Sequence, residues 1–467
     1  NQIKEWGMKR LRSLALSLCL FIAVCGLAAA DDTGSRFRAG RQGTVISVSD
    51  IHFDPLLTTD KAVADKIKNS GYLRWRAIYS SSSDKHISPV GEETNYNLLA
   101  STLVEMKGVC STPDFILFSG DLLAHKFRNY RTEVFSDNER AYRAFVKETL
   151  KFIGEEVHRT FPHVHVVFTL GNNDSYGDYE IEPNGSFLHN TMNIFFTYYL
   201  KAEPAKLNSF ASTFESGGNY AYLPTVSSAN RVLSINDIFF SEKSGYNDYG
   251  WQQLEWLEKQ LKAAKKNKQN VWIVLHIPPG VDTWGTVKEG HVAAFWDVLH
   301  KDRDSRTFTD KFQELVQTYS PIIKGIFSGH THMDHFRLIF DKSHNPLAYV
   351  HITPAISPQY GNNPGFQVLT YDAGSFSVTD FDTYYYDGAA WKEEYDFDST
   401  YGKAAYDASN LAAIYSHLSD DAALRRSFVD YYDVHNPQGN LITESNWKAN
   451  WCGIGSLSDD DFNACYR

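Results

Sequence analysis

The sequence has little positive charge, no internal repeat and no low-complexity linker. Its 45 Lys and Arg residues are outnumbered by 56 Asp and Glu residues, which gives a formal net charge of −11 at pH 7. A protein that serves as a nucleic-acid scaffold normally carries a basic stripe, so this charge argues against that class. An acidic protein that handles phosphate needs a local positive centre, and bound metal ions can supply one.

Cysteine is also scarce, with five residues in a chain of 467. Cys19 and Cys25 lie in a segment near the N-terminus that we expect to be removed. Cys452 and Cys465 flank a short acidic segment at the C-terminus, and we predict that they form a disulfide in an oxidising compartment. Cys110 is then left as a buried free thiol.

Long apolar runs are absent except near the beginning of the chain. After Met8, basic residues precede an apolar run from Leu14 to Leu27, and small residues follow at 28–30. This order is typical of a signal peptide, and the run is short for a membrane span. We therefore expect residues 1–30 to be upstream residues and a signal peptide. The mature protein is expected to be secreted or periplasmic, without a stable membrane anchor.

Five short apolar segments share one pattern: each is predicted to be a buried strand that ends at residues able to bind a metal. The segments are 44–48 before Asp50, 115–118 before Gly120 and Asp121, 164–170 before Gly171 and Asn172, 271–275 before His276, and 322–327 before Gly329 and His330. Strands that are apolar on both faces are typical of layered α/β folds. Ligands of such folds bind where the loops after the strands converge.

Helical patterns lie between these strands and after them. Apolar stripes predict helices over residues 92–107, 140–158 and 250–268. Beyond Tyr384 the strand pattern is scarce, and helices are expected over 404–417 and 421–432. We expect a catalytic domain over residues 41–385 and a small helical C-terminal subdomain over 396–467.

Each metal-competent motif is weak evidence when it is taken alone. Alternate residues of an extended chain point to the same side, so the pairs Asp50/His52 and His330/His332 each present two ligands together. Taken alone, Asp121 could be an ordinary turn residue, and His276 could be a histidine of the core. The evidence lies in the combination of the five motifs.

The five motifs in this order resemble the calcineurin-like metallophosphoesterases. The family pattern is D-x-H, GD, GN-[HN]-[DE], a lone strand-end His and GH-x-H, and it extends here from Val45 to His332. The resemblance implies an α/β fold, a layered sandwich of two mixed β-sheets flanked by helices. It also implies a two-metal hydrolase in which a hydroxide that bridges the metals attacks phosphorus in line.

The resemblance further implies the metal ligands. Asp121 would bridge the two ions, because a carboxylate is the natural shared ligand. The other ligands would be Asp50, His52 and His332 for the first metal, and Asn172, His276 and His330 for the second. Oxygen and imidazole donors suit two zinc ions first, with manganese or iron as alternatives.

Within this superfamily, further residues resemble the acid-sphingomyelinase-like phosphodiesterases. They are His125 four positions after the bridging Asp121, the segments 353–358 and 361–366, and the helical tail with its cysteines. The resemblance implies that His125 helps to handle phosphate or the leaving group. The alternative is a loop histidine on the surface.

Two departures affect the expected substrate. Only about 20 residues separate the expected cleavage site from Asp50, so we expect no counterpart of the saposin-type module of acid sphingomyelinase. This favours a soluble substrate over a bilayer lipid. Asn173 stands where the family often has a catalytic His. An amide can donate a hydrogen bond to a phosphoryl oxygen but cannot deliver a proton. Asn173 therefore favours substrates with acidic leaving groups. The motif GNND at residues 171–174 also resembles that of secreted endopolyphosphatases.

These observations predict an exported, monomeric hydrolase that cleaves phosphodiester or phosphoanhydride bonds in a soluble phosphorylated small molecule, with nucleotides as the first class. The alternatives are a sphingomyelinase, an endopolyphosphatase, and a catalytically silent relative that binds phosphorylated ligands. Most aromatic residues in a chain of this size are core residues. The candidates to line a base-stacking pocket are Tyr72, Trp75, Tyr176, Tyr179 and Tyr360.

Overall fold

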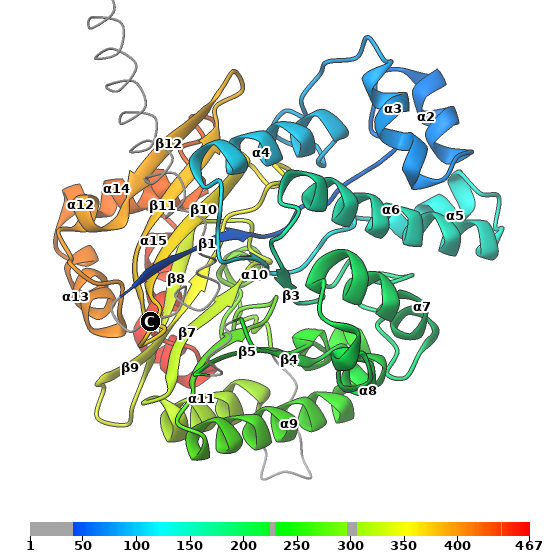
Figure 1. Cartoon of the computed structure of the whole chain (residues 1–467). Coiled ribbons are helices and arrows are strands. Elements are labelled where there is room, and N and C mark those ends of the chain that lie inside the picture. Colours follow the sequence, from blue (N-terminus) through cyan, green and yellow to red (C-terminus); the bar gives the residue numbers. More distant parts are fainter. Residues whose placement is uncertain (1–40, 225–228, 297–305, 440) are drawn as a thin grey trace, which may run out of the picture.

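The structure is a computed structural model that describes residues 41–224, 229–296, 306–439 and 441–467 (Figure 1). The expected signal peptide, with Cys19 and Cys25, lies outside the described residues. Among the described residues, no helix has both the length and the apolar character that crossing a membrane requires.

The first sheet has six strands in the order β12-β11-β10-β1-β2-β3. Its central strand β1 (Gln42–Val48) runs parallel to β2 (Phe115–Phe118), which runs parallel to β3 (Val166–Phe168). On its other side β1 pairs antiparallel with β10 (Gly365–Asp372), so that Gln42 faces Asp372. The antiparallel strands β11 (Val378–Tyr386) and β12 (Trp391–Asp396) complete the sheet.

The second sheet also has six strands, in the order β4-β5-β6-β7-β9-β8. Four of them are parallel, and β4 and β8 are antiparallel at the edges. Their bounds are Tyr220–Tyr222 (β4), Asn230–Ser234 (β5), Asn270–Val274 (β6), Ile323–Ser328 (β7), His335–Phe340 (β8) and Pro346–Ile352 (β9).

Aromatic side chains fill the space between the two sheets. Trp272 of β6 is fully buried, and its ring lies 5.7 Å from Phe115 of β2 and 5.5 Å from Tyr371 of β10. Its indole N–H donates a hydrogen bond to the carbonyl of Phe376 at 2.6 Å, which satisfies the one polar group that this side chain buries. The predicted α/β sandwich of two mixed sheets is confirmed.

Helices cover both sheets, and the three that were predicted in the catalytic region are present. They are α4 (Tyr96–Val109), α6 (Glu139–Thr160) and α9 (Asn247–Lys266). Figure 1 shows α4 and α6 on one side of the molecule, and α9 beside α11 (Phe308–Tyr319) on the opposite side. The remaining helices before β7 are α2 (Lys61–Lys68), α3 (Trp75–Ser80), α5 (Tyr130–Glu133), α7 (Ser186–Ile194), α8 (Leu207–Gly217) and α10 (Thr283–Glu289).

Helix α4 begins four residues later than its apolar stripe predicts. Asn95 has an extended backbone, and its side chain accepts a hydrogen bond from the N–H of Leu98 at 2.9 Å, which caps the helix. Thr94 pairs instead with Phe53. The segment before α4 is therefore extended, and Glu93 lies in it.

The helices of the C-terminal region pack against the second sheet, except the first of them, which contacts β11 and β12 of the first sheet. Helices α13 (Ala408–Leu418) and α14 (Ala422–Tyr432) match the two helices expected there, and α13 contacts β9. The other helices are α12 (Phe397–Tyr401), α15 (Trp447–Gly455), which contacts β8, and α16 (Asp459–Tyr466). Strand β12 was not expected beyond Tyr384. It is an edge strand whose exposed charges hide the alternating pattern.

The expected disulfide joins Cys452 of α15 to Cys465 of α16, and Cys110 is a buried free thiol. The two bonded cysteines are 13 residues apart, so the bond restricts a short loop of the unfolded chain. We expect the double variant Cys452→Ala/Cys465→Ala to unfold with a free energy lower by about 3 kcal/mol. Urea denaturation of variant and wild type measures it, with the wild type reduced by a phosphine as the matched control. Identical midpoints for all three samples would contradict the prediction.

Candidate metal centre

Seven polar side chains converge where strands of the two sheets end. Three parallel strands of the first sheet and two of the second point their carboxyl ends at the same place, as expected for ligands in an α/β fold. Asp50 and His52 follow β1, Asp121 follows β2, Asn172 follows β3, His276 follows β6, and His330 and His332 follow β7.

Five of these residues have a backbone conformation that L-residues rarely adopt. Their φ angles are positive: 47° at Asp50, 43° at His52, 57° at Asp121, 69° at His330 and 66° at His332. Left-handed backbone costs a non-glycine residue about 1–2 kcal/mol. Such strain persists where the surrounding structure imposes it, and it clusters at functional sites. Here it turns each loop sharply enough for its side chains to face a common centre.

Two motif glycines allow the loops to approach one another closely. A Cβ atom on Gly171 would lie 2.0 Å from Oδ1 of Asp121, and one on Gly329 would lie 1.7 Å from Oγ of Ser49. Any side chain at either position would force the loops after β2 and β3, or after β1 and β7, apart. The glycines of the GN and GH-x-H motifs therefore set the distance between the candidate ligands.

The first group of donor atoms surrounds Nε2 of His52. This nitrogen lies 3.1 Å from Nε2 of His332, 3.6 Å from Oδ1 of Asp50 and 3.5 Å from Oδ2 of Asp121. Oδ1 of Asp50 is also 3.6 Å from Nε2 of His332. All four side chains are buried.

The second group surrounds Nε2 of His276. It lies 3.3 Å from Oδ2 of Asp121, 3.2 Å from Oδ1 of Asn172 and 3.3 Å from Nδ1 of His330. Oδ2 of Asp121 thus belongs to both groups. A shared carboxylate oxygen is what two neighbouring cations require of one ligand.

The donor sets fit two divalent cations. Ligands held 2.0–2.2 Å from a tetrahedral ion are about 3.4 Å apart, and the distances of 3.1–3.6 Å from Nε2 of His52 and from Nε2 of His276 to their neighbours are close to this value. Oδ1 of Asp50 is buried with no hydrogen-bond partner, a costly state that a cation would relieve. Nδ1 of His52 lies 3.0 Å from the carbonyl of Leu123, and Nδ1 of His276 lies 2.7 Å from that of Ser119, which leaves Nε2 of each ring as the donor to a metal.

The bridging candidate is held in its ionised form. Burial alone would raise the pKa of Asp121, but the charges of His276 and His52 outweigh it and hold the pKa well below its ordinary value. An ionised carboxylate between two imidazole clusters is able to bind a cation at neutral pH.

His125 lies beside this centre. Its ring stacks on that of His52 with centroids 3.8 Å apart, and it lies 5.6 Å from the ring of His332. Its Nδ1 is 2.8 Å from Oε1 of Glu93. The side chain of His125 is 20% exposed, whereas those of His52 and His332 are buried, so His125 is the one that solvent reaches.

The family model for the calcineurin-like phosphoesterases matches residues 43–334. The chain belongs to this family. Its match spans every candidate ligand from Asp50 to His332.

Curated relatives refine the family assignment. "Sphingomyelinase phosphodiesterase D" of Dictyostelium discoideum is 29% identical over 80% of each chain. Human "acid sphingomyelinase-like phosphodiesterase 3b" and human "cyclic GMP-AMP phosphodiesterase SMPDL3A" are each 24% identical over 90% of this chain and 89% of their own. With the family match, these relatives identify the chain as a metal-dependent phosphodiesterase, and the resemblance drawn from its motifs is confirmed.

Asn173 of this phosphoesterase is engaged with the bridging candidate. Its backbone N–H donates to Oδ1 of Asp121 at 2.7 Å, and its side-chain amide donates to Oδ2 at 2.8 Å. The side-chain amide of Asn173 therefore orients the carboxylate that would bridge the metals.

Two buried carboxylates hold the loops of the phosphoesterase together, and neither was predicted. Asp174 accepts hydrogen bonds from the N–H groups of Asp121 and Gly171, both at 2.9 Å, so it joins the loops after β2 and β3. Asp237 accepts from the N–H groups of His276 and Ile277. Asp174 stands inside the GNND motif, which was the signal available for it.

The aromatic candidates for a base-stacking pocket differ in exposure and in distance from His125. Tyr360 is 51% exposed, and its ring lies 5.1 Å from that of His125. Tyr179 donates its N–H to the carbonyl of Asn172. Trp75 is fully buried against Phe152 and is a core residue.

Proposed function

We propose that this phosphoesterase hydrolyses phosphodiester or phosphoanhydride bonds in soluble phosphorylated small molecules, with nucleotides as the first class. Two divalent cations, zinc first, would be held by Asp50, His52, Asp121, Asn172, His276, His330 and His332. The position of Oδ2 of Asp121, within 3.5 Å of His52 and 3.3 Å of His276, is the observation that carries the proposal.

Bound cations supply Lewis acidity, which lowers the pKa of water and neutralises the phosphoryl oxygens in an in-line displacement. The side chains of the protein fix where this happens. Asn173 holds both oxygens of Asp121, and the peptide carbonyls behind His52 and His276 fix the orientation of those rings. His125 is the residue available to protonate the leaving group, because it lies beside the centre and is reached by solvent.

We also propose that the protein is exported, and we propose its domain bounds, oligomeric state and substrate candidates. A protein with a C-terminal disulfide suits an oxidising compartment, which supports export. We assign the catalytic domain to residues 41–385 and the helical subdomain to 396–467, and we propose a monomer. The name of the human cyclic GMP-AMP phosphodiesterase supports a nucleotide substrate. The name of the Dictyostelium relative supports sphingomyelin as a second candidate.

Metal removal tests the proposal. We expect the wild type to hydrolyse bis-p-nitrophenyl phosphate, a cyclic dinucleotide or ATP, to lose this activity on chelation, and to regain it with zinc or manganese at two ions per chain. Release of phosphocholine from sphingomyelin micelles but no turnover of the soluble substrates would favour the second candidate. Failure to turn over any substrate with two metals bound would overturn both and leave a silent phosphate-binding protein.

A further inference from the structure

We propose that Glu93 is a positioning residue that orients His125 toward the leaving group of the substrate. This inference rests on the proposed function, because it assigns a residue that acts through His125. Glu93 lies in the extended segment before α4, outside the five motifs that carry the candidate metal ligands.

The carboxylate of Glu93 forms hydrogen bonds with His125 and Ser357, two residues close to the candidate metal ligands. Oε1 accepts a hydrogen bond from the backbone N–H of His125 at 3.1 Å and lies 2.8 Å from Nδ1 of the same residue. Oε2 accepts from the hydroxyl of Ser357 at 3.3 Å. One oxygen therefore holds both the backbone and the ring of His125, while the other is anchored to a different loop.

These contacts determine which ring nitrogen meets the substrate. Oε1 already accepts one N–H, and an ionised carboxylate can only accept, so Nδ1 of His125 is the protonated donor of the second bond. Nε2 is then the ring nitrogen left for the substrate. A histidine without such a partner can present either nitrogen, in either tautomer, and can rotate about its side-chain bonds.

The backbone around Glu93 is tied to the segments that carry the metal ligands. The N–H of the next residue, Thr94, donates to the carbonyl of His52 at 3.2 Å, and the carbonyl of Thr94 accepts from Asp54 at 2.9 Å. The N–H of Ser357 donates to the carbonyl of Asp50 at 3.0 Å. Glu93 and its anchor therefore share one rigid frame with the candidate ligands of the first metal.

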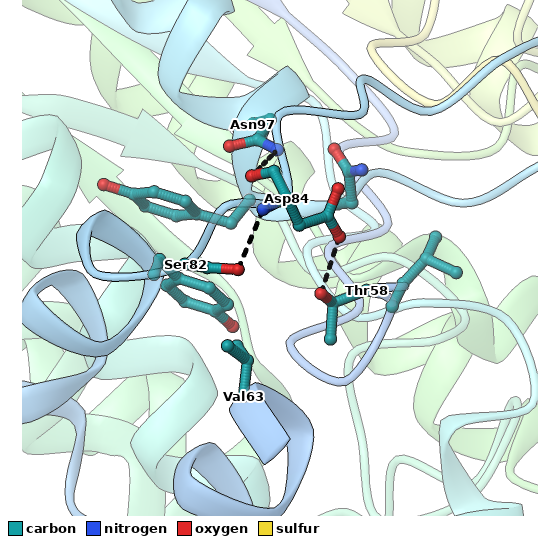
Figure 2. A pocket seen from close by; sticks show the side chains of 9 residues that line it. Thr58, Val63, Ser82, Asp84 and Asn97 are labelled. Atoms are coloured by element: carbon teal, nitrogen blue, oxygen red, sulfur yellow. Dashed lines mark hydrogen bonds between the residues drawn. The ribbon is translucent and has the colours of Figure 1, made fainter. Parts of the chain in front are cut away.

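The loop that precedes Glu93 is fixed as well. Figure 2 shows a pocket in which Asp84 accepts a hydrogen bond from the hydroxyl of Thr58 at 2.7 Å, while its carbonyl accepts from Asn97 at 3.2 Å. The backbone N–H of Asp84 donates to Ser82. These polar groups form hydrogen bonds with one another. The bonds fix the segment that carries Glu93 at Asp84 before it and at Asn97 after it.

The step that Glu93 supports is proton delivery. As the bond between phosphorus and the leaving oxygen breaks, its electron pair stays on that oxygen. The imidazolium form of His125, which carries a proton on each ring nitrogen, gives its Nε2 proton to that oxygen and becomes the neutral ring with Nδ1–H. The bond from Nδ1 to Glu93 persists throughout. Orientation of an acid in this way matters most for leaving groups that are poor without a proton, and least for acidic ones.

A series of bis-aryl phosphates, from p-nitrophenyl to phenyl, tests the proposal in the metal-loaded protein. For Glu93→Gln we expect kcat to fall about 10–100-fold with the phenyl ester and less than about threefold with the p-nitrophenyl ester. Two metals per chain should remain bound. Glu93→Asp, which keeps the charge, should restore part of the loss. Adding Glu93→Gln to His125→Ala should change nothing further.

The matched control is Glu92→Gln, because Glu92 is the adjacent carboxylate, its side chain is 44% exposed, and it pairs with His86 at 3.8 Å. It should behave as the wild type. An active wild type with equal losses for all esters in Glu93→Gln, or an additive effect in the double variant, would overturn the role of Glu93 alone. A wild type that hydrolyses none of the esters with two metals bound would instead overturn the proposed function.

Discussion

Replacing Asp121 by Asn is expected to lower kcat/KM for phosphodiester hydrolysis by about 10³-fold or more, with loss of at least one metal ion per chain. The carboxylate oxygen Oδ2 is the atom that both donor groups share, and an amide in its place carries no charge to hold two cations together. Asn is the suitable replacement, because it tolerates the left-handed backbone of Asp121 better than Ala does. Metal analysis and steady-state kinetics measure both effects.

Asp137→Asn is the matched control for this experiment. Asp137 is an exposed loop residue with a similar φ of 61°, so the same substitution is made in the same backbone conformation away from the metal centre. It should retain wild-type activity and metal content. If Asp121→Asn kept two metals per chain and normal turnover, Asp121 would not bridge the ions.

Removal of the Asp174 carboxylate is expected to have the largest effect on stability. Asp174 is fully buried, and its two oxygens accept from the N–H groups of Asp121, Leu122, Leu123 and Gly171. Without an acceptor, each buried N–H costs about 1 kcal/mol or more, so Asp174→Ala should lower the free energy of unfolding by about 4 kcal/mol. It should also weaken metal binding, because the loop that carries Asp121 loses its anchor.

Chemical denaturation of the metal-free protein measures this effect, with Asp174→Asn as a milder variant that preserves volume. The control is Asp341→Ala. Asp341 also accepts from backbone N–H groups, those of Ser343 and Asn345, but in an exposed turn where water replaces the lost acceptor. Its substitution should cost less than about 1 kcal/mol. Equal costs at the two positions would show that the Asp174 contacts add little to stability.

The strands that carry the candidate ligands were predictable, whereas much of the scaffold around them was not. The apolar runs before Asp50, Asp121 and His276 are β1, β2 and β6, because a strand covered on both faces is apolar throughout. The convergence of their ends followed from the fold class. The assignment of the seven side chains as ligands stays a prediction. Strands β11 and β12 of the first sheet carry polar residues and gave no comparable signal.

The residues that support the site were missed for identifiable reasons. The apolar stripe of α4 was extended back to residue 92, which placed Glu93 in a helix and hid its contact with His125. Asn95 caps the N-terminus of α4, so the helix begins at Tyr96 and does not include Glu93. Asp174 was read as part of a turn motif, since its hydrogen bonds reach N–H groups more than 50 residues away. Contacts between distant loops leave no local pattern in a sequence.

The position of β1 has a consequence for the time at which this protein becomes active. In the finished sheet Gln42 of β1 faces Asp372 of β10, and the carbonyl of Asp50 accepts from the N–H of Ser357. At about 5–20 residues per second, a ribosome needs roughly 15–60 s to make the chain between these partners. During that interval one side of β1 remains unpaired, an aggregation hazard. The loop of Asp50 also lacks the contact that fixes it, so metal loading must await nearly complete synthesis.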